Sequence, residues 1–157
     1  PMVYYGDEAG MWGANDPCCR KPMVWADIKY RDEHYLGDGT KRKVGDKVEF
    51  DKDLFEHYRK LIQIRKNCPA LQLGDFVTLI TNNAKQIYAF SRNYGDQKVI
   101  VVLNNSNRPQ KTKIKLTKKD IYRDLLNEKL YENKDKLLEL EVKAKWGVIL
   151  VNIDSLK

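Results

Sequence analysis

The residues best suited to chemistry lie in the stretch YYGDEAGMWGANDPCCRKPMVW, residues 4–25. Asp16 and Arg20 stand four residues apart in a proline-containing segment with no regular periodicity. A carboxylate and a planar guanidinium could hold one another in an ion pair that shapes a loop, or both could reach the hydroxyls of a sugar. Trp12 could form a stacking platform for a sugar ring, and packing under its own loop is an equally good interpretation. The stretch is therefore a candidate ligand-binding loop.

Catalytic side chains are not expected in this chain. Asp7 and Glu8 are adjacent carboxylates, but neighbours in an extended segment point to opposite sides of the backbone. They would not flank one bond at the separation of roughly 5 Å that a retaining glycosidase needs. The two histidines, His34 and His57, follow no serine or cysteine elbow, so a nucleophilic triad is not expected either.

The sequence predicts no metal site and no cofactor. The cysteines are Cys18, Cys19 and Cys68, without a Cys-x-x-Cys motif or a histidine pair that would complete a zinc site. No oxygen-rich loop has the spacing of a calcium site, and calcium binding outside these residues stays open. An odd cysteine count favours free thiols and does not settle the cellular compartment.

Length and charge limit the classes of protein to consider. The 157 residues suffice for one domain, or for a small domain with part of another, and 42% are hydrophobic, as in globular proteins. The net charge of +7 invites a nucleic-acid interpretation. However, the run QKTKIKLTKK at residues 110–119 places its lysines on one face of a strand, which predicts a solvated face instead. No apolar run is long enough to span a bilayer.

The first half of the chain predicts a strand, a long loop and a helix. Residues 2–5 read as a short buried strand, and residues 6–49 have little periodicity, which suggests a loop that serves a site. Residues 51–66 have helical spacing of apolar side chains, with Asp51 as the N-terminal cap and a staple between Phe50 and Phe55. A start at Asp53, with Glu56 completing a capping box, is the alternative. Pro69 should end this helix.

The second half predicts an antiparallel β-sandwich of Greek-key type, so the fold class is mainly β. Turn residues separate short β-rich runs at regular intervals, as in sandwiches and barrels. These runs cover residues 76–81, 86–92, 98–104, 111–116, 122–126, 137–142 and 146–153. The inward set would include Ile87, Ala89, Val99, Val101, Leu138, Leu140, Val142, Val148 and Leu150. Where both faces of a strand are apolar, the sequence does not decide which alternate set of side chains points inward.

The motifs together resemble those of the α-amylase family, glycoside hydrolase family thirteen. Pro-x-x-Tyr-Tyr-Gly-Asp-Glu at residues 1–8 resembles the end of that family's eighth barrel strand. GMWGANDPCCRKPMVW at residues 10–25 is similar to a loop of neopullulanases, cyclomaltodextrinases and maltogenic amylases, in which Asp-Pro-x-x-Arg follows a glycine-rich segment. The pattern Arg-x-x-x-Pro-Ala-Leu at residues 65–71 resembles the end of the eighth barrel helix, and the β-rich remainder looks like the sandwich that follows the barrel.

This resemblance implies a (β/α)₈ barrel enzyme that cleaves α-glucosidic bonds with retention. The loop would form part of the substrate cleft at the C-terminal face of the barrel. Asp16 and Arg20 match family positions that contact glucose units on the non-reducing side of the cleavage point. The family's catalytic aspartate, its acid/base glutamate and its stabilising aspartate belong to earlier strands, which are absent from these residues.

The resemblance also divides the chain and limits its activity. Residues 1–70 would be the end of a catalytic barrel, and residues 71–157 would be a C-terminal sandwich domain. We expect a C-terminal piece of an α-glucan hydrolase that is inactive alone, whose partners are an α-glucan oligosaccharide and the N-terminal part of its own barrel. We also expect its helix to pack on the sandwich. The alternative is a carbohydrate-binding or structural module without a hydrolytic role; bond preference, oligomeric state and localisation stay open.

Overall fold

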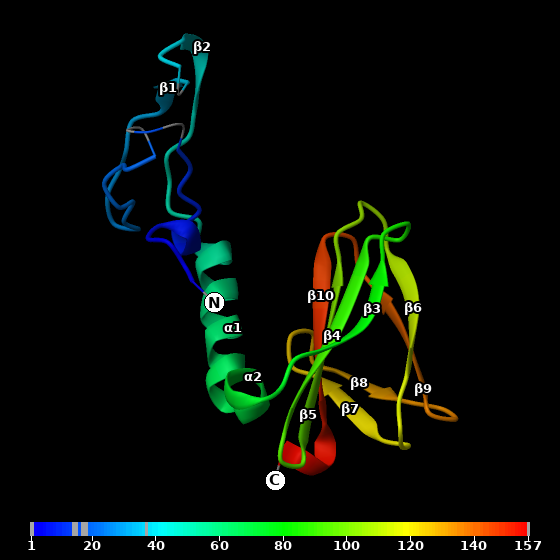
Figure 1. The fold of residues 1–157 in the computed structure, drawn as a ribbon. Helices are drawn as coiled ribbons and strands as arrows, with labels where there is room; N and C mark the ends of the chain where they lie inside the picture. Colours follow the sequence, from blue (N-terminus) through cyan, green and yellow to red (C-terminus); the bar gives the residue numbers. More distant parts are fainter. Residues whose placement is uncertain (1, 14–15, 17–18, 37, 157) are drawn as a thin grey trace. The chain divides into compact units, whose positions relative to one another are not determined.

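The computed structural model describes residues 2–13, 16, 19–36 and 38–156, and the chain divides into two compact units. The first unit comprises Pro1–Lys60 and the second comprises Leu61–Lys157. Helix α1 (Lys52–Asn67) begins in the first unit and ends in the second (Figure 1). Among the described residues, no helix has the length and apolar character needed to cross a bilayer.

The strands of the first unit differ from the prediction: none forms at residues 2–5, and two form later in the segment that was expected to be a loop. The prediction of a buried strand at residues 2–5 is wrong, because these residues form no strand and Met2 is 89% exposed. A strand needs a neighbour for its backbone N–H and C=O groups, and none pairs with residues 2–5 in the described part of the chain.

The segment expected to be one long loop contains three short elements among its described residues. A 3₁₀ helix, η1 (Asp7–Ala9), is followed by the antiparallel pair β1 (Glu33–Tyr35) and β2 (Lys41–Asp46). The turn of this pair includes Gly39 at φ +85°, in the left-handed region that glycine adopts without strain.

The N-terminus of α1 confirms the predicted cap and staple. The Asp51 Oδ1 atom accepts the Leu54 N–H at 2.9 Å, and the Phe50 and Phe55 ring centroids lie 5.2 Å apart. At the other end Pro69 does more than stop the helix, because it begins a second short helix, α2 (Pro69–Leu73). The Arg65 guanidinium donates to the Leu71 carbonyl and ties the two helices together.

The second unit is an antiparallel sandwich, as predicted. Its larger sheet has the order β3-β4-β5-β10-β7-β8, and its smaller sheet pairs β6 with β9 (Figure 1). The strands are β3 (Val77–Asn82), β4 (Ile87–Tyr94), β5 (Gln97–Asn104), β6 (Gln110–Lys115), β7 (Ile121–Asp124), β8 (Lys129–Glu132), β9 (Leu137–Val142) and β10 (Trp146–Asn152), followed by the 3₁₀ helix η2 (Ile153–Leu156). The chain changes sheet before and after both β6 and β9, and β10 inserts between β5 and β7. Each predicted β-rich run overlaps one of these strands, with ends that differ by up to two residues. The short edge strand β8 was not predicted.

Two apolar clusters cover the two faces of the larger sheet. The cluster between the sheets includes Ile87, Ala89, Ile100, Val102, Ile114, Leu138, Leu140, Val142, Val148 and Leu150. The placement of Val99 and Val101 inside the sandwich is wrong. These two valines face the other way and pack with Ile64, Cys68 and Ala70 of the helical segment. All four residues 99–102 are apolar, so alternation does not distinguish the faces, and the helices bury the second one.

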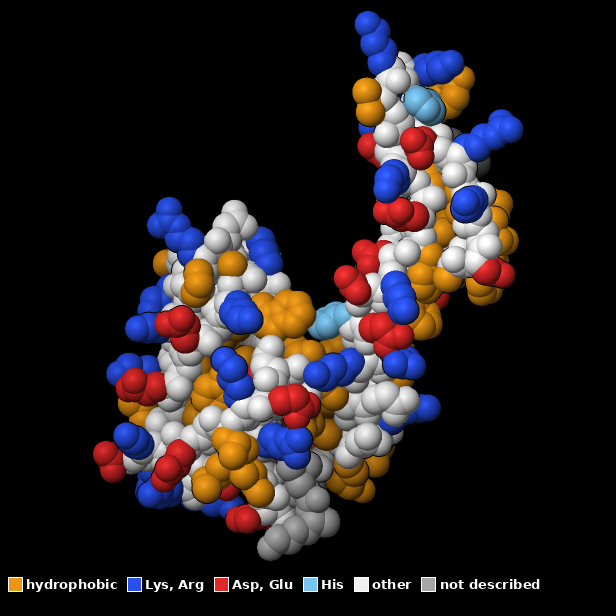
Figure 2. All heavy atoms as spheres, turned by 180° about the vertical axis from the view of Figure 1, so that it is seen from behind, with side chains coloured by type: hydrophobic (Ala, Val, Ile, Leu, Met, Phe, Trp, Pro, Cys, Tyr) orange, Lys and Arg blue, Asp and Glu red, His pale blue; other side chains and the backbone are white. Residues whose placement is uncertain are grey.

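The lysine-rich strand β6 has the predicted solvated face. Lys111, Lys113 and Lys115 are exposed, whereas Ile114 between them is buried. Lys113 Nζ lies 2.5 Å from the Glu139 carboxylate, and Lys111 Nζ lies 3.7 Å from that of Glu141, both across the β6-β9 pair. Acidic and basic side chains are likewise interspersed on the face of the sandwich drawn in Figure 2. These lysines are therefore partly neutralised by their own sheet.

A buried carboxylate fixes the turn between β7 and β8. Asp124 is 0% exposed, and its Oδ1 atom accepts the N–H groups of Leu126, Asn127 and Ile149 at 3.0, 3.3 and 3.2 Å. Its Oδ2 atom accepts the Asn127 side-chain amide at 2.6 Å. Because the Ile149 N–H belongs to β10, one carboxylate joins the turn to the centre of the sheet.

We expect Asp124→Ala to lower the free energy of unfolding by about 3 kcal/mol, because it leaves one buried and several partly buried donors without an acceptor. Urea unfolding followed by far-UV circular dichroism measures this loss. Glu139→Ala is the control, since it removes an exposed ion pair worth less than about 1 kcal/mol. Equal losses for the two variants would contradict the assigned role of Asp124.

The thiols of Cys19 and Cys68 should differ in reactivity. Cys68 is 1% exposed, and burial raises the pKa of its thiol above the ordinary value of 9.0, whereas Cys19 is exposed. Since the thiolate is the reactive species, we expect iodoacetamide at pH 8 to alkylate Cys19 in the folded chain and Cys68 after unfolding in urea. Peptide mass spectrometry separates the two sites, and equal rates in the folded chain would refute the burial of Cys68.

Candidate functional site

Two left-handed glycines and two local carboxylates shape the start of the candidate loop. Gly6 and Gly10 have φ of +89° and +71° and flank η1. Asp7 Oδ2 accepts the Tyr4 N–H, and Glu8 Oε2 accepts the Gly6 N–H, each at 3.0 Å. The two carboxylates thus lie in a 3₁₀ turn, not in the extended segment assumed from the sequence, and both hold that turn closed.

The loop is docked on the first turn of α1. The Asp51 N–H donates to the Ala9 carbonyl at 3.0 Å. At Gly10 the contact is so close that an added Cβ would lie 2.9 Å from the Asp51 Cβ. Asp51 therefore both caps the helix and holds the loop that precedes Trp12.

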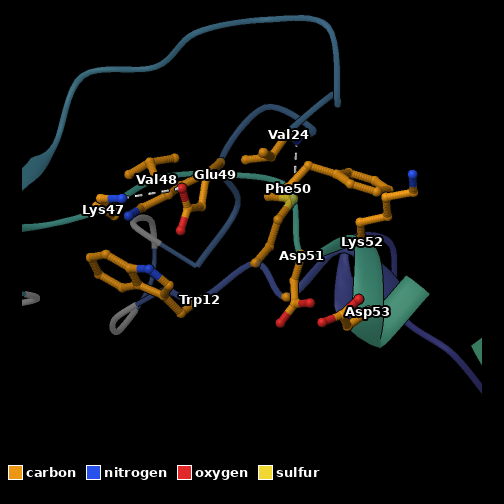
Figure 3. Close-up of a pocket in the computed structure, with 12 residues that line it drawn as sticks. Trp12, Val24, Lys47, Val48, Glu49, Phe50, Asp51, Lys52 and Asp53 are labelled. Atoms are coloured by element: carbon orange, nitrogen blue, oxygen red, sulfur yellow. Dashed lines mark hydrogen bonds and ion pairs between the residues drawn. The ribbon is translucent and has the colours of Figure 1, made fainter. Parts of the chain in front are cut away.

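A pocket of about 420 Å³ opens beside this docking point (Figure 3). Its wall includes Trp12 and Phe50 as aromatic surfaces, with Lys21, Glu49 and Asp51 as polar groups. In Figure 3 the Glu49 carboxylate points toward the side on which the Trp12 indole lies. Aromatic surface with charged donors and acceptors suits a ligand that has an apolar ring face and several hydroxyls.

Lys21 connects the pocket wall to the β1–β2 pair. Its Nζ atom lies 4.2 Å from the Trp12 ring centroid and 2.7 Å from Glu33 Oε2. The Tyr5 hydroxyl donates to the Lys21 carbonyl at 2.9 Å and fixes its backbone. The hydrogen bond from Lys21, followed by that from the Tyr35 N–H, lowers the pKa of the Glu33 carboxyl below its ordinary value of 4.5.

Asp16 and Arg20 form the ion pair that was one of the two interpretations of their spacing. Arg20 Nε lies 3.0 Å from Asp16 Oδ1, and the side chains are 69% and 64% exposed. The Cys19 thiol donates to the same carboxylate oxygen at 3.7 Å; the neighbouring Cys18 lies outside the described residues. The pair keeps the Arg20 guanidinium accessible, so the ion pair and a role in ligand binding are compatible.

The structure brings one of the three predicted site residues to the pocket. Trp12 lines it and is 39% exposed, whereas Asp16 and Arg20 are not among its lining residues. Lys21 was missed, because a cation and an aromatic ring nine residues apart in a loop give no periodic signal. In the described part of the chain, no three His, Cys, Asp or Glu side chains converge as a metal site would require.

Comparisons with known proteins cover nearly the whole chain. The family model of the alpha-amylase C-terminal domain matches residues 74–150. Neopullulanase 2 of Thermoactinomyces vulgaris is 32% identical over 154 residues, which cover 97% of this chain and 23% of that protein. The chain belongs to the α-amylase family.

Other α-amylase family members agree with this assignment. A cyclomaltodextrinase of Thermoanaerobacter pseudethanolicus is 36% identical over 110 residues, covering 70% of this chain and 15% of that protein. The crystal structure of an Anoxybacillus α-amylase, 24% identical, superposes with a TM-score of 0.74 over 95% of this chain and 28% of its own, which shows the shared fold. The chain spans about a quarter or less of the length of these relatives.

The stabilisation that the Lys21–Glu33 pair provides should depend on pH. Because the Glu33 pKa is lowered in the folded chain, the pair contributes its full stabilisation above the ordinary value of 4.5 and loses it as pH falls through the lowered value. A carboxyl-carbon NMR titration should give a Glu33 midpoint below 4.5.

In Lys21→Met that midpoint should move upward, toward 4.5, while the Tyr35 N–H and the nearby charge of Arg42 keep part of the depression. Lys29→Met, which changes an exposed lysine of the same unit, is the control. A Glu33 midpoint unaffected by Lys21→Met would refute the pairing.

Proposed function

We propose that this chain is the C-terminal region of an α-glucan hydrolase that acts on starch-like polymers or cyclodextrins with retention of configuration. The observation that carries this proposal is the 32% identity to a neopullulanase over 154 residues, which includes both the candidate loop and the sandwich. The names of the relatives, neopullulanase and cyclomaltodextrinase, support the substrate class.

In this proposal the first residues supply part of the substrate cleft. Trp12 would stack on a glucose ring, and Asp16 and Arg20 would bind the hydroxyls of glucose units on the non-reducing side of the cleavage point. The exposure of the Asp16–Arg20 pair and the pocket beside Trp12 support these roles. The reaction itself would need carboxylates from other strands, since Asp7 and Glu8 are engaged by their own turn. The chain alone would therefore be inactive.

We propose that a domain boundary follows residue 70 and that residues 71–157 form a stabilising sandwich domain, on which residues 61–70 of the same compact unit pack. The family match over residues 74–150 supports this division. Apolar surface remains exposed next to the boundary: Phe76 is 57% exposed and stacks on Phe90 at 4.8 Å between ring centroids. This surface would contact the remainder of the catalytic barrel, because an exposed apolar patch marks a surface that another part of the protein can cover.

Hydrolysis of pullulan, starch and β-cyclodextrin tests the proposal. Reducing ends released by this chain should be compared with those released by the longer polypeptide of which we propose it to be a part. We expect activity in the longer polypeptide and none in this chain. A longer polypeptide inert toward every α-glucan would overturn the proposed function. Activity in this chain alone would assign chemistry to carboxylates such as Asp7, Glu8 and Asp16.

Arg20→Ala should raise the KM of the longer polypeptide for maltooligosaccharides by about tenfold or more, because a charged hydrogen bond to the substrate is lost. Thermal stability should stay unchanged, since an exposed ion pair contributes little. Arg59→Ala is the matched control: Arg59 is another exposed arginine, paired with Glu56 at 2.6 Å on α1. If both variants raised KM equally, Arg20 would have no specific role in substrate binding.

A further inference from the structure

Trp12 extends from a segment without regular secondary structure. Residues 11–13 belong to no helix or strand, and Gly10 and Gly13 flank the Met11–Trp12 pair. Within the described residues, no hydrogen bond from the Trp12 indole N–H is found. A ring in such a segment would sample several rotamers, and ordering it would cost part of any binding energy.

The ammonium group of Lys21 contacts this ring. We propose that Lys21 is a positioning residue, which holds the Trp12 indole against the pocket wall so that the ring can stack on a sugar of an α-glucan. The inference rests on the proposed function and assigns a role that the family resemblance does not give to Lys21. Its basis is the ammonium group 4.2 Å from the Trp12 ring centroid.

The position of the Lys21 ammonium is itself determined from several sides. Glu33 Oε2 lies 2.7 Å from Nζ, and Glu33 Oε1 accepts the Tyr35 N–H at 3.3 Å, so the carboxylate cannot rotate freely. The Tyr5 hydroxyl holds the Lys21 carbonyl. Both charged side chains of the pair are only 25% exposed, which separates them from the fully solvated ion pairs of the surface.

The arrangement leaves part of the ring free for a ligand. The ammonium covers one face of the indole, and the tryptophan as a whole is still 39% exposed. A sugar that stacks on the uncovered surface finds the ring already oriented, and the loss of side-chain freedom on binding is smaller. Lys21 then acts on the sugar through Trp12 and need not touch it.

Fluorine NMR of the chain labelled with 5-fluorotryptophan tests the positioning step without any ligand. Trp12, Trp25 and Trp146 give three resonances, and Trp12→Phe identifies that of Trp12. We expect Lys21→Met to shift and narrow the Trp12 resonance toward that of a mobile ring, and Lys21→Arg to restore it in part, because arginine keeps the cation. Lys47→Met is the matched control, since Lys47 lines the same pocket but is paired with Glu49.

Unchanged Trp25 and Trp146 resonances in these variants show that the chain is folded. A Trp12 resonance equally unaffected by Lys21→Met and Lys47→Met would overturn the positioning role. So would an equal shift caused by both variants.

Titration with maltotriose tests whether an α-glucan oligosaccharide binds at Trp12. We expect the Trp12 resonance of the unmodified sequence to move on titration, and Lys21→Met to weaken the affinity by about three- to tenfold, with Lys47→Met close to the unmodified value. A Trp12 resonance that maltotriose never moves would overturn both the sugar-stacking role and its basis in the proposed function. The ligand-free comparison would still report on positioning, so the two failures are distinguishable.

Discussion

The pairing of β5 with β10 is the interaction on which the second unit depends. Residues 99–104 of β5 face residues 146–151 of β10 in continuous antiparallel register, and the apolar side chains of residues 99–102 and 148–151 are buried on both faces of the sheet. A sheet with two apolar faces needs another element of structure packed on each of them. The β6–β9 pair supplies one, and the end of α1 with α2 supplies the other. The helical segment is therefore part of the core that supports the sandwich.

The regular features of this architecture could be predicted from the sequence. The sandwich strands follow from short β-rich runs between turn residues, and the α1 cap follows from Asp51 and Phe50. Two kinds of feature could not. Val99 and Val101 belong to a strand that is apolar on both sides, so only the packed helices decide which side each valine faces. Residues 2–5 have strand composition, but a strand also requires a pairing partner.

The candidate site could be predicted where it depends on residues that are close in the sequence. Asp16 and Arg20 are four residues apart, and the ion pair foreseen as one alternative is present. The wall of the pocket depends on contacts between distant segments: Gly10 meets Asp51, and Lys21 meets Glu33. Such contacts follow from the path of the loop, which has no periodicity from which to derive them. This explains why Trp12 could be singled out by its type, whereas Lys21 emerged only from the three-dimensional arrangement.

The place of β10 in the chain has a consequence for how the sandwich is made. Among the described strands β10 comes last in the sequence, yet it occupies an interior position of the larger sheet, between β5 and β7. During synthesis the backbone N–H and C=O groups on one edge each of β5 and β7 therefore stay unpaired until β10, the last of the described strands, has left the ribosome. Contacts between strands so distant in sequence form slowly, and unpaired strand edges invite association. Folding of this unit should be a late, cooperative event that follows completion of β10.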